Sequence, residues 1–487
     1  MELLIPLDSE SKMPLYEQIY RHIRKEIREG ALGAGEKLPS SRILAENLKV
    51  SRSTVQMAYD QLLAEGYMET IPCRGCFVSR IEGLVGVEAV GQQGGKLTDG
   101  EESAGRDFPN PSDRGFSEKG NPLIDFSPRG IDLEKFPFSI WRKLNRDILV
   151  DGNRELFQAG DPRGELSLRR EIRTYLHSAR GVNCQEDQII VGAGSEYLLM
   201  LLSRILGPKH RIAMENPTYK QAYRVLSGEG YDVVPVDMDH SGMRADLLKK
   251  SGADIAYVMP SHQYPMGVVM PITRRQELLA WAWREEERFI IEDDYDSEFR
   301  YKGIPVPALQ GMDQKERVIY MGTFSKSIAP AIRVGFLVLP RTLLPLYPER
   351  AAFYASAVSR IDQNVLCQFM VGGHYERHLN RMRALYRGKH DALLTALKPL
   401  EREFEIQGEN AGLHVLMTSR KGIAEERLVE LANEMGVKVY GLSAYFIRQE
   451  QNHYPPTVIL GYASLTIEQI QNGASQLLRA WKDVEKC

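Results

Sequence analysis

The sequence predicts two folded units of different class, a small unit that is mostly helical and a large unit of the α/β class. Helical periodicity followed by two short strands fills residues 1–80, and strands alternate with helices over residues 123–487. Between them, residues 81–122 are rich in glycine, serine and charged residues and show no apolar period. We therefore predict a domain over 1–80, a flexible linker over 81–122 and a second domain over 123–487.

The composition is that of a globular protein and excludes several classes. Of 487 residues, 43% are hydrophobic and 26% are charged, so disorder and collagen are ruled out. The net charge of -3 excludes a globally basic nucleic-acid coat but allows a local basic patch. No apolar run reaches the roughly 18 residues of a membrane helix. The first twelve residues do not read as a secretory signal, and the five scattered cysteines fit a reducing compartment, so we expect a cytoplasmic protein with no membrane partner.

The N-terminal pattern is typical of a winged helix-turn-helix. Four apolar residues spaced by four mark a first helix: Leu15, Ile19, Ile23 and Ile27. A second helix begins after Pro39, with Ser40 or Ser41 as its N-cap. A tight turn at 49–51 leads into a third helix capped by Ser51, and short strands at 67–71 and 77–78 flank a turn at 72–75. Two helices joined by a short turn and followed by a hairpin make this motif.

Polar and basic residues at the start of the third helix are the candidate DNA contacts. Backbone N–H donors and the positive end of the helix dipole meet there. These residues are Ser51, Arg52, Ser53 and Thr54. Arg42 starts the preceding helix and is placed for a phosphate, and Arg74 lies at the tip of the wing. Acidic and basic residues balance within 1–80, so a helical protein-interaction module is the alternative.

Three N-terminal segments resemble the GntR family of bacterial winged-helix regulators. They are PLYEQI at 14–19, GEKLPSSR at 35–42 and VSRSTV at 50–55. The resemblance runs through residues 13–80 and implies a double-stranded DNA operator as partner. Cys73 and Cys76 lie in the wing without further metal ligands nearby, so no metal is predicted. A redox pair and two small wing residues remain the alternatives for them.

The large unit carries the groups that pyridoxal 5′-phosphate requires. This cofactor needs a lysine for a Schiff base, a carboxylate for its pyridinium nitrogen, an anion cradle and a ring platform. Asp293 follows the strand predicted at 289–291, and Lys326 follows the strand predicted at 318–321. Because ligands of α/β sheets bind at the carboxyl ends of strands, we expect these two side chains to share one pocket.

Two further segments offer donors for the phosphate. The hydroxyls of Thr323 and Ser325 and the guanidinium of Arg333 are suitable partners for a dianion. The glycine-rich turn at 192–195 joins a strand to a helix and provides a second cradle, which adds Gly194, Ser195 and Glu196 to the candidate site. Each motif is weak alone, and their order and positions at strand ends carry the prediction.

Residues 123–487 resemble the fold type I aminotransferases. Thr323-x-x-Lys326 and Arg333-Val334-Gly335 are similar to that family's lysine and phosphate-arginine motifs. The resemblance implies that Tyr219 and Tyr295 touch the cofactor ring or its hydroxyl. Tyr264 stands where the family has an asparagine, and His262 or Gln263 is the candidate substitute. Residues 153–164, with Phe157 replacing a tyrosine, resemble the family's segment that reaches into a partner subunit, so a homodimer is expected.

A GntR-type reader joined by a linker to an aminotransferase-like domain resembles the MocR/GabR-like subfamily of regulators. SHQYP at 261–265 and IEDDYDSEF at 291–299 are similar to that subfamily's variants. The resemblance implies a transcription regulator that binds pyridoxal phosphate and senses the cofactor or a small amine or amino acid. GABA, taurine, a D-amino acid dipeptide and the cofactor itself are open as effectors.

Two alternatives to sensing with a bound cofactor are an active aminotransferase with an appended DNA reader and a sensor that has lost the cofactor. Transaminases acting on amino acids generally bind the substrate carboxylate with an arginine, and the resemblance aligns that arginine with Ile459, while Arg448 lies outside the motif. The replacement favours sensing over turnover. Retention of Lys326, Asp293 and Arg333 disfavours loss of the cofactor.

Overall fold

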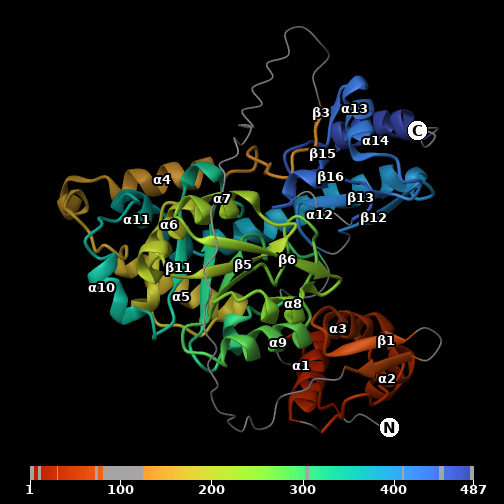
Figure 1. Ribbon diagram of the computed structural model, residues 1–487, viewed down its shortest axis with the longest axis horizontal. Helices are drawn as coiled ribbons and strands as arrows, with labels where there is room; N and C mark the ends of the chain where they lie inside the picture. Colours follow the sequence, from red (N-terminus) through yellow and green to blue (C-terminus); the bar gives the residue numbers. More distant parts are fainter. Residues whose placement is uncertain are drawn as a thin grey trace, which may run out of the picture.

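The computed structural model describes residues 5–8, 13–29, 31–71, 75–79, 124–301, 306–408, 411–448 and 454–482 (Figure 1). The predicted linker at 81–122 and the wing residues Cys73 and Arg74 lie outside these ranges. The described residues form a small N-terminal unit, a large α/β body and a C-terminal α+β lobe, so the predicted fold classes are confirmed.

The small unit is a three-helix cluster with an antiparallel hairpin. Ile19, Ile23 and Ile27 of the predicted stripe are buried in its core. The hydroxyl of Ser40 accepts a hydrogen bond from the backbone N–H of Ile43 at 3.3 Å, which identifies Ser40 as the N-cap of the second helix. The elements are α1 Leu15–Arg28, α2 Ser41–Leu48, α3 Arg52–Ala64, β1 Met68–Ile71 and β2 Gly75–Val78.

The body is built on an eight-stranded sheet with the order β4-β11-β10-β9-β8-β5-β6-β7. The five strands from β10 to β6 are mutually parallel, and β11, β4 and β7 run antiparallel to their neighbours. The strands are β4 Ile189–Gly192, β5 Arg211–Asn216, β6 Asp232–Asp239, β7 Gly242–Met243, β8 Ile255–Val258, β9 Phe289–Asp294, β10 Val318–Thr323 and β11 Gly335–Val338. Strand β9 is longer than predicted and includes Asp293.

Helices cover both faces of this sheet. Successive residues of each buried strand point to opposite faces, so Ile190 packs under α6 and α7 while Ile189 packs under α5 and α11. Helices α8 and α9 complete the second face. The helices of the body are α4 Phe138–Ile148, the 3-10 helix η1 Asp151–Phe157, α5 Leu166–Arg180, α6 Ser195–Leu206, α7 Lys220–Gly228, α8 Ala245–Lys250, α9 Ile272–Ala282, α10 Tyr347–Arg350 and α11 Arg360–Val371.

The C-terminal lobe is reached through a long helix and has its own antiparallel sheet of order β12-β13-β16-β15. Strand β3, which opens the large unit, pairs with β14 and so fastens its start to the lobe. The elements are β3 Ile124–Asp125, α12 His374–Leu397, β12 Phe404–Gln407, β13 His414–Ser419, α13 Glu425–Glu434, β14 Val437–Lys438, β15 Tyr440–Gly441, β16 Thr457–Gly461 and α14 Ile467–Trp481.

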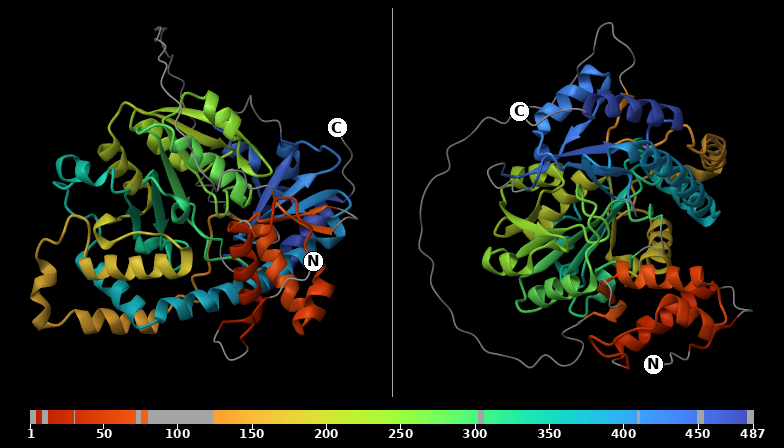
Figure 2. Two further views of the ribbon diagram at one scale, coloured as in Figure 1. Left: turned by 90° about the horizontal axis from the view of Figure 1, so that it is seen from below. Right: turned by 90° about the vertical axis from the view of Figure 1, so that its right-hand side faces the viewer.

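The small unit packs against the start of α9 (Figure 2). The backbone N–H of Ile272 donates to the carbonyl of Glu65 at 2.9 Å. The Ile272 side chain is 5% exposed and joins the apolar core of the small unit. A Cβ on Gly66 would come within 2.6 Å of Pro271, so the two backbones meet closely. Among the described helices, none has the length and apolarity needed to cross a bilayer.

Candidate cofactor pocket and DNA-reading face

A cavity of about 310 Å³ opens at the carboxyl ends of β9 and β10. Nine of the eleven predicted cofactor-site residues line it: Ser195, Glu196, Tyr219, Asp293, Tyr295, Thr323, Ser325, Lys326 and Arg333. The parallel strand order brings together side chains that lie far apart in the sequence. Five further lining residues were not among the predicted contacts: Pro128, Arg129, Met259, Tyr264 and Pro330.

Lys326 follows β10 and extends toward the loop at 128–129. Its ammonium donates to the carbonyl oxygens of Arg129 at 3.0 Å and Pro128 at 3.4 Å. Burial lowers the pKa of Lys326 to about 8, and the nearby Arg129 charge acts in the same direction. The amine is therefore neutral in a larger fraction of molecules than an ordinary lysine, as a nucleophile toward an aldehyde must be.

Asp293 presents one unsatisfied oxygen at the cavity. Its Oδ2 accepts a hydrogen bond from the Tyr257 hydroxyl, while its buried Oδ1 has no partner among the described groups. Burial raises the pKa of Asp293 to about 7. Buried carboxylate oxygens are normally hydrogen-bonded, and a pyridinium N–H would supply the missing donor and hold the acid ionised. The residues present thus fit pyridoxal phosphate on this side.

A buried ion pair holds the end of β9. Arg180 Nε donates to Asp294 at 2.7 Å, and Arg180 Nη2 donates to the Ser261 hydroxyl at 2.6 Å. This contact ties the strand that carries Asp293 to the segment that follows β8. Sequence reasoning did not find it, and its only visible signal was the pair of adjacent acids at 293 and 294.

The opposite end of the cavity is built to receive an anion. Gly194 has a φ of 89°, and a Cβ there would lie 3.0 Å from the Arg333 guanidinium. Arg333 Nη2 donates to the Ala193 carbonyl at 3.0 Å and to Glu196 at 3.1 Å. The hydroxyls of Thr323 and Ser325 lie 3.1 Å apart beside this turn. With the N-terminus of α6, they form a cradle of donors that fits a phosphate.

The residues considered as substitutes for the family's asparagine lie behind the cavity wall. His262 Nδ1 lies 2.9 Å from Asp296 and 3.1 Å from the Tyr295 hydroxyl. The Gln263 side chain donates to the Pro217 carbonyl at 2.9 Å and so belongs to the loop. Tyr264 itself lines the cavity, and its hydroxyl donates to the Tyr445 hydroxyl at 3.0 Å. Tyr264 therefore shapes the pocket wall directly.

The predicted DNA contacts on α2 and α3 are of two kinds: hydroxyl residues that bond one another at the N-cap of α3, and exposed arginines. Ser51 caps the helix by accepting from the Thr54 backbone N–H at 3.1 Å, and its hydroxyl also bonds those of Ser53 and Thr54. Arg52 is exposed at this end. Arg42 is exposed on α2 and pairs with Glu46 at 3.3 Å. Of the candidate DNA contacts, Arg74 alone lies outside the described residues.

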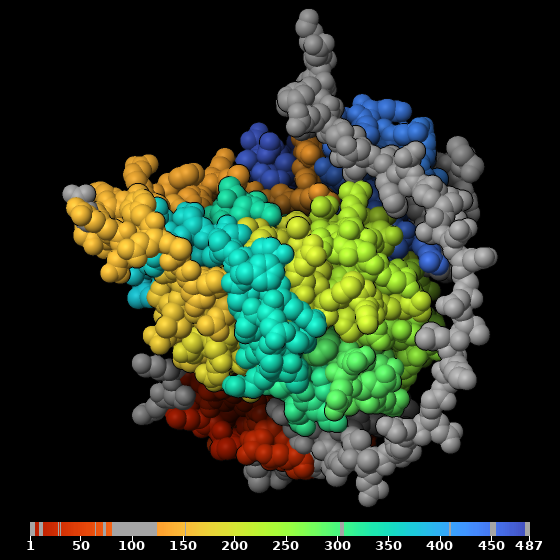
Figure 3. Space-filling view, turned by 60° about the vertical axis from the view of Figure 1, so that its left-hand side comes forward, coloured from red at the N-terminus to blue at the C-terminus, as the bar shows by residue number. Residues whose placement is uncertain are grey.

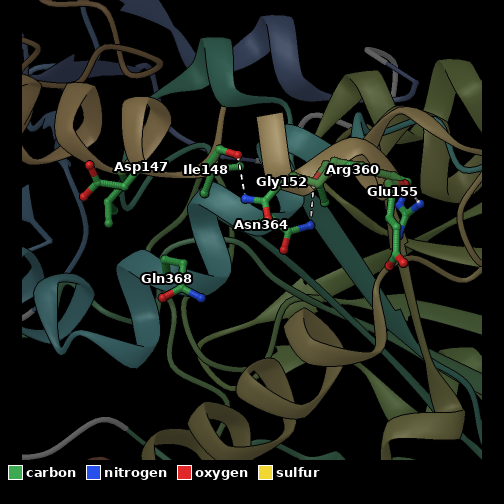
Figure 4. Close-up of a pocket in the computed structure, with 10 residues that line it drawn as sticks. Asp147, Ile148, Gly152, Glu155, Arg360, Asn364 and Gln368 are labelled. Atoms are coloured by element: carbon green, nitrogen blue, oxygen red, sulfur yellow. Dashed lines mark hydrogen bonds between the residues drawn. The ribbon is translucent and has the colours of Figure 1, made fainter. Parts of the chain in front are cut away.

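A second cavity of about 410 Å³ lies away from the predicted cofactor residues, between α4, η1 and α11 (Figure 4). Asn364, Gln368 and Arg360 line it from α11, Asp147 lines it from α4, and Gly152 lines it from η1. None of the residues predicted to bind the cofactor lines it. Of these two cavities, the residues predicted to bind the cofactor therefore line only the smaller one.

Comparison with known proteins identifies the family. Residues 131–477 match the model of the aminotransferase class I and II family, and residues 15–78 match that of bacterial regulatory proteins of the gntR family. The uncharacterized HTH-type transcriptional regulator YhdI of Bacillus subtilis (strain 168) is 39% identical over 482 residues, covering 99% of this chain and 98% of the relative. The probable rhizopine catabolism regulatory protein MocR of Rhizobium meliloti is 33% identical over 489 residues, covering 99% and 97%. The chain belongs to the MocR/GabR-like subfamily of GntR-type regulators.

Comparison with solved structures supports an aminotransferase-like fold for the large unit. Kynurenine aminotransferase from Pyrococcus horikoshii aligns with a TM-score of 0.66 and 25% identity, over 74% of this chain and 91% of that chain. The predicted family and the aminotransferase-like fold are thus confirmed. In this MocR/GabR-like chain, a helix-turn-helix unit precedes a complete aminotransferase-like body.

Proposed function

We propose that this regulator reads a double-stranded DNA operator through the start of α3 and holds pyridoxal 5′-phosphate on Lys326. We further propose that the loaded pocket senses the cofactor or a small amine or amino acid. The observation that carries the cofactor assignment is the unpartnered, buried Oδ1 of Asp293 in the same cavity as the Lys326 amine.

Each predicted residue has a role consistent with its position. Lys326 provides the amine for the covalent link, and Asp293 accepts from the ring nitrogen. Bound pyridoxal phosphate supplies an electron-withdrawing ring and a reversible covalent bond to amines. The remaining members of the site hold the phosphate or flank the ring, namely Gly194, Ser195, Glu196, Thr323, Ser325, Arg333, Tyr219 and Tyr295, with His262 positioning Tyr295.

The pocket is joined to the DNA-reading unit through α9. The side chain of Arg275 on α9 donates to the carbonyls of Pro260 and Met270, both at 2.9 Å. Pro260 begins the segment that leads to Tyr264 at the cavity, and the first residue of α9, Ile272, bonds Glu65 of the small unit. A ligand that moves this segment would shift the small unit between a docked and an undocked arrangement. It can do so only if it binds the pocket with different affinity in the two arrangements.

A homodimer is part of the proposal because an apolar arm projects from the body. The segment with α4 and η1 stands out at one edge of the molecule (Figure 3). Phe157 on it is 72% exposed, and Phe138, Leu149 and Val150 are each at least 49% exposed. Such a concentration of apolar side chains favours a protein interface, and a two-fold dimer would bring two DNA readers to a repeated site.

The test of the cofactor assignment is reconstitution followed by borohydride reduction and peptide mapping. The full-length protein should turn yellow with pyridoxal phosphate, and the reduced adduct should map to Lys326. Lys326→Ala should stay colourless, while Lys220→Ala, which removes another partly buried lysine, should behave as the wild type. An adduct on any other residue, or a colourless wild-type protein in excess cofactor, would overturn the assignment.

Steady-state turnover distinguishes this function from the alternative of an active aminotransferase. At the position aligned with the family's carboxylate-binding arginine, Ile459 is fully buried in the apolar core. Because the carboxylate is then not held from β16, as it is in transaminases that act on amino acids, we expect the loaded protein to bind amines without multiple turnovers. Sustained keto-acid formation from an amino acid would establish the enzymatic alternative.

A further inference from the structure

The cofactor cavity contains a cation that the cofactor does not require. Three basic side chains line it, namely Lys326, Arg129 and Arg333. Lys326 is committed to the covalent link, and Arg333 lies at the phosphate end in contact with Glu196. The guanidinium of Arg129 makes no hydrogen bond or ion pair with any residue in the described part of the chain. It remains available to a ligand.

The backbone that carries Arg129 is held firmly over the end of β16. The Gly461 N–H donates to the Phe126 carbonyl at 2.8 Å. A Cβ on Gly461 would lie 2.2 Å from the Ser127 carbonyl oxygen, and one on Gly130 would lie 2.5 Å from the Ser464 hydroxyl. These close approaches, together with the two hydrogen bonds from Lys326, fix the loop at 126–130 at the cavity.

Arg129 shares the cavity lining with Tyr264 and Tyr219, and the Tyr264 hydroxyl donates to the Tyr445 hydroxyl behind the lining. Burial raises the pKa of Tyr264 and Tyr445, and the positive charge of Arg129 opposes that rise at each of them. Ile459 packs in the same apolar cluster as these two tyrosines. Among the described residues that line the cavity, the arginine near Tyr264 therefore comes from the loop at 126–130, and β16 contributes no arginine there.

We propose that Arg129 binds the carboxylate of an amine effector whose amino group meets the cofactor at Lys326. The proposal rests on the proposed function and names the ligand class, a primary amine that bears a carboxylate. A guanidinium suits this group because its planar N–H donors match the two carboxylate oxygens. The two carboxylates among the described lining residues are Glu196, which pairs with Arg333, and Asp293, which bonds Tyr257, and neither forms an ion pair with Arg129.

The experiment compares amines that differ only in the carboxylate. β-Alanine is paired with n-propylamine, and L-alanine with isopropylamine, each titrated into the protein loaded with pyridoxal phosphate. Binding is followed by the visible absorbance of the cofactor and, independently, by the thermal midpoint. The variants are Arg129→Gln, Arg129→Lys and the control Arg402→Gln, which alters an exposed arginine that does not line the cavity.

We expect wild type and Arg402→Gln to prefer at least one amino acid over its matched amine. Arg129→Gln should lose about tenfold or more in affinity for that amino acid, the equivalent of one charge-assisted hydrogen bond, and leave the plain amine nearly unchanged. Arg129→Lys should recover part of the preference. Equal affinities for both members of each pair in wild type, no response to either amino acid, or an unchanged preference in Arg129→Gln would overturn the proposal. A protein that forms no yellow adduct before any amine is added would instead refute the proposed function.

Discussion

At the scale of single residues, Asp293 and Lys326 are shifted toward their neutral forms by the same physical cause. Burial penalises a charge of either sign, so it raises the pKa of Asp293 to about 7 and lowers that of Lys326 to about 8. Bound pyridoxal phosphate would relieve both penalties, because its ring nitrogen would pair with the acid and its aldehyde would react with the amine.

The coupling of pyridoxal phosphate to Lys326 should depend on pH in a definite direction. The neutral amine is the nucleophile, and the folded-state pKa lies below the usual 10.5. The rate should therefore rise as pH increases through about 8 and level off above it. Stopped-flow absorbance measures this profile, and a rate that still rises steeply near the ordinary lysine pKa would contradict the assigned environment.

Replacing Asp293 by Asn should weaken cofactor binding while leaving the lysine link possible. The substitution removes the charge that pairs with the ring nitrogen, which we expect to cost about tenfold or more in affinity. Asp246→Asn, at an exposed acid on α8, is the control. Equilibrium dialysis gives the affinities, and equal values for the Asp293 variant and the control would show that Oδ1 does not meet the ring.

At the scale of elements, α3 serves packing and recognition with different faces. Val55, Ala58 and Leu62 are fully buried in the core of the small unit. Arg52 and Ser53 stay exposed at the N-terminus, where the helix dipole favours phosphate. The C-terminal end of the same helix, at Glu65, contacts α9. One helix thus joins the predicted reading end to the large α/β body.

Substitutions at Arg52 and Arg42 should affect operator binding differently. Arg52→Ala should lose discrimination between operator and mismatched DNA by about 1–3 kcal/mol, the value of a bidentate base contact. Arg42→Ala should weaken all sequences similarly and reduce the salt dependence. Gel-shift titrations at several salt concentrations, with Arg21→Ala on α1 as control, separate these effects. Unchanged operator affinity in both variants would show that α3 is not the reading helix.

At the scale of the whole molecule, the contact between α3 and α9 is the route by which we propose that the pocket influences DNA binding. Ile272 is buried against the core of a unit that begins more than 200 residues earlier in the sequence. Loss of the Ile272 contact should uncouple the small unit from the body. Neither part should unfold, because each has its own apolar core.

Ile272→Asp should undock the DNA reader. The substitution buries an unpaired carboxylate in the apolar contact between α9 and the small unit. Separation of the small unit from the body returns that charge to water. Small-angle scattering should show a more extended particle, and the effect of an added amine on operator affinity should disappear, while cofactor absorbance is retained. Ile467→Asp, at an exposed isoleucine on α14, is the matched control. An amine response of unchanged size in Ile272→Asp would contradict coupling through α9.

The proposed dimer makes a separate prediction for the projecting arm. Phe157→Glu should shift the protein toward monomer in sedimentation equilibrium, because it introduces a charge on an apolar side chain that is 72% exposed in the single chain. Ile467→Glu should leave the association state unchanged. A wild-type protein that is monomeric at micromolar concentration would refute the dimer itself.

The sequence by itself determined the elements and the order in which they occur. The spacing of Ile19 and Ile23, the capping serine at 51 and the positions of Asp293 and Lys326 after apolar strands are local signals, and each was readable because helical period, capping and strand ends depend on neighbouring residues. The resemblance to the aminotransferases extended this reading to Tyr219 and Tyr295.

Only the tertiary structure decided which distant residues meet. Lys326 reaches the carbonyl of Arg129, 197 residues away, and Arg180 pairs with Asp294 across 114 residues. Neither pair has a local pattern, because the order in which strands assemble in the sheet, not the sequence interval, sets the distance between them. The docking of Ile272 on the small unit has the same origin. The sequence therefore predicted which residue types build the pocket. The position of Arg129 at the cavity, and the contact of α9 with the small unit, depend on how the chain packs.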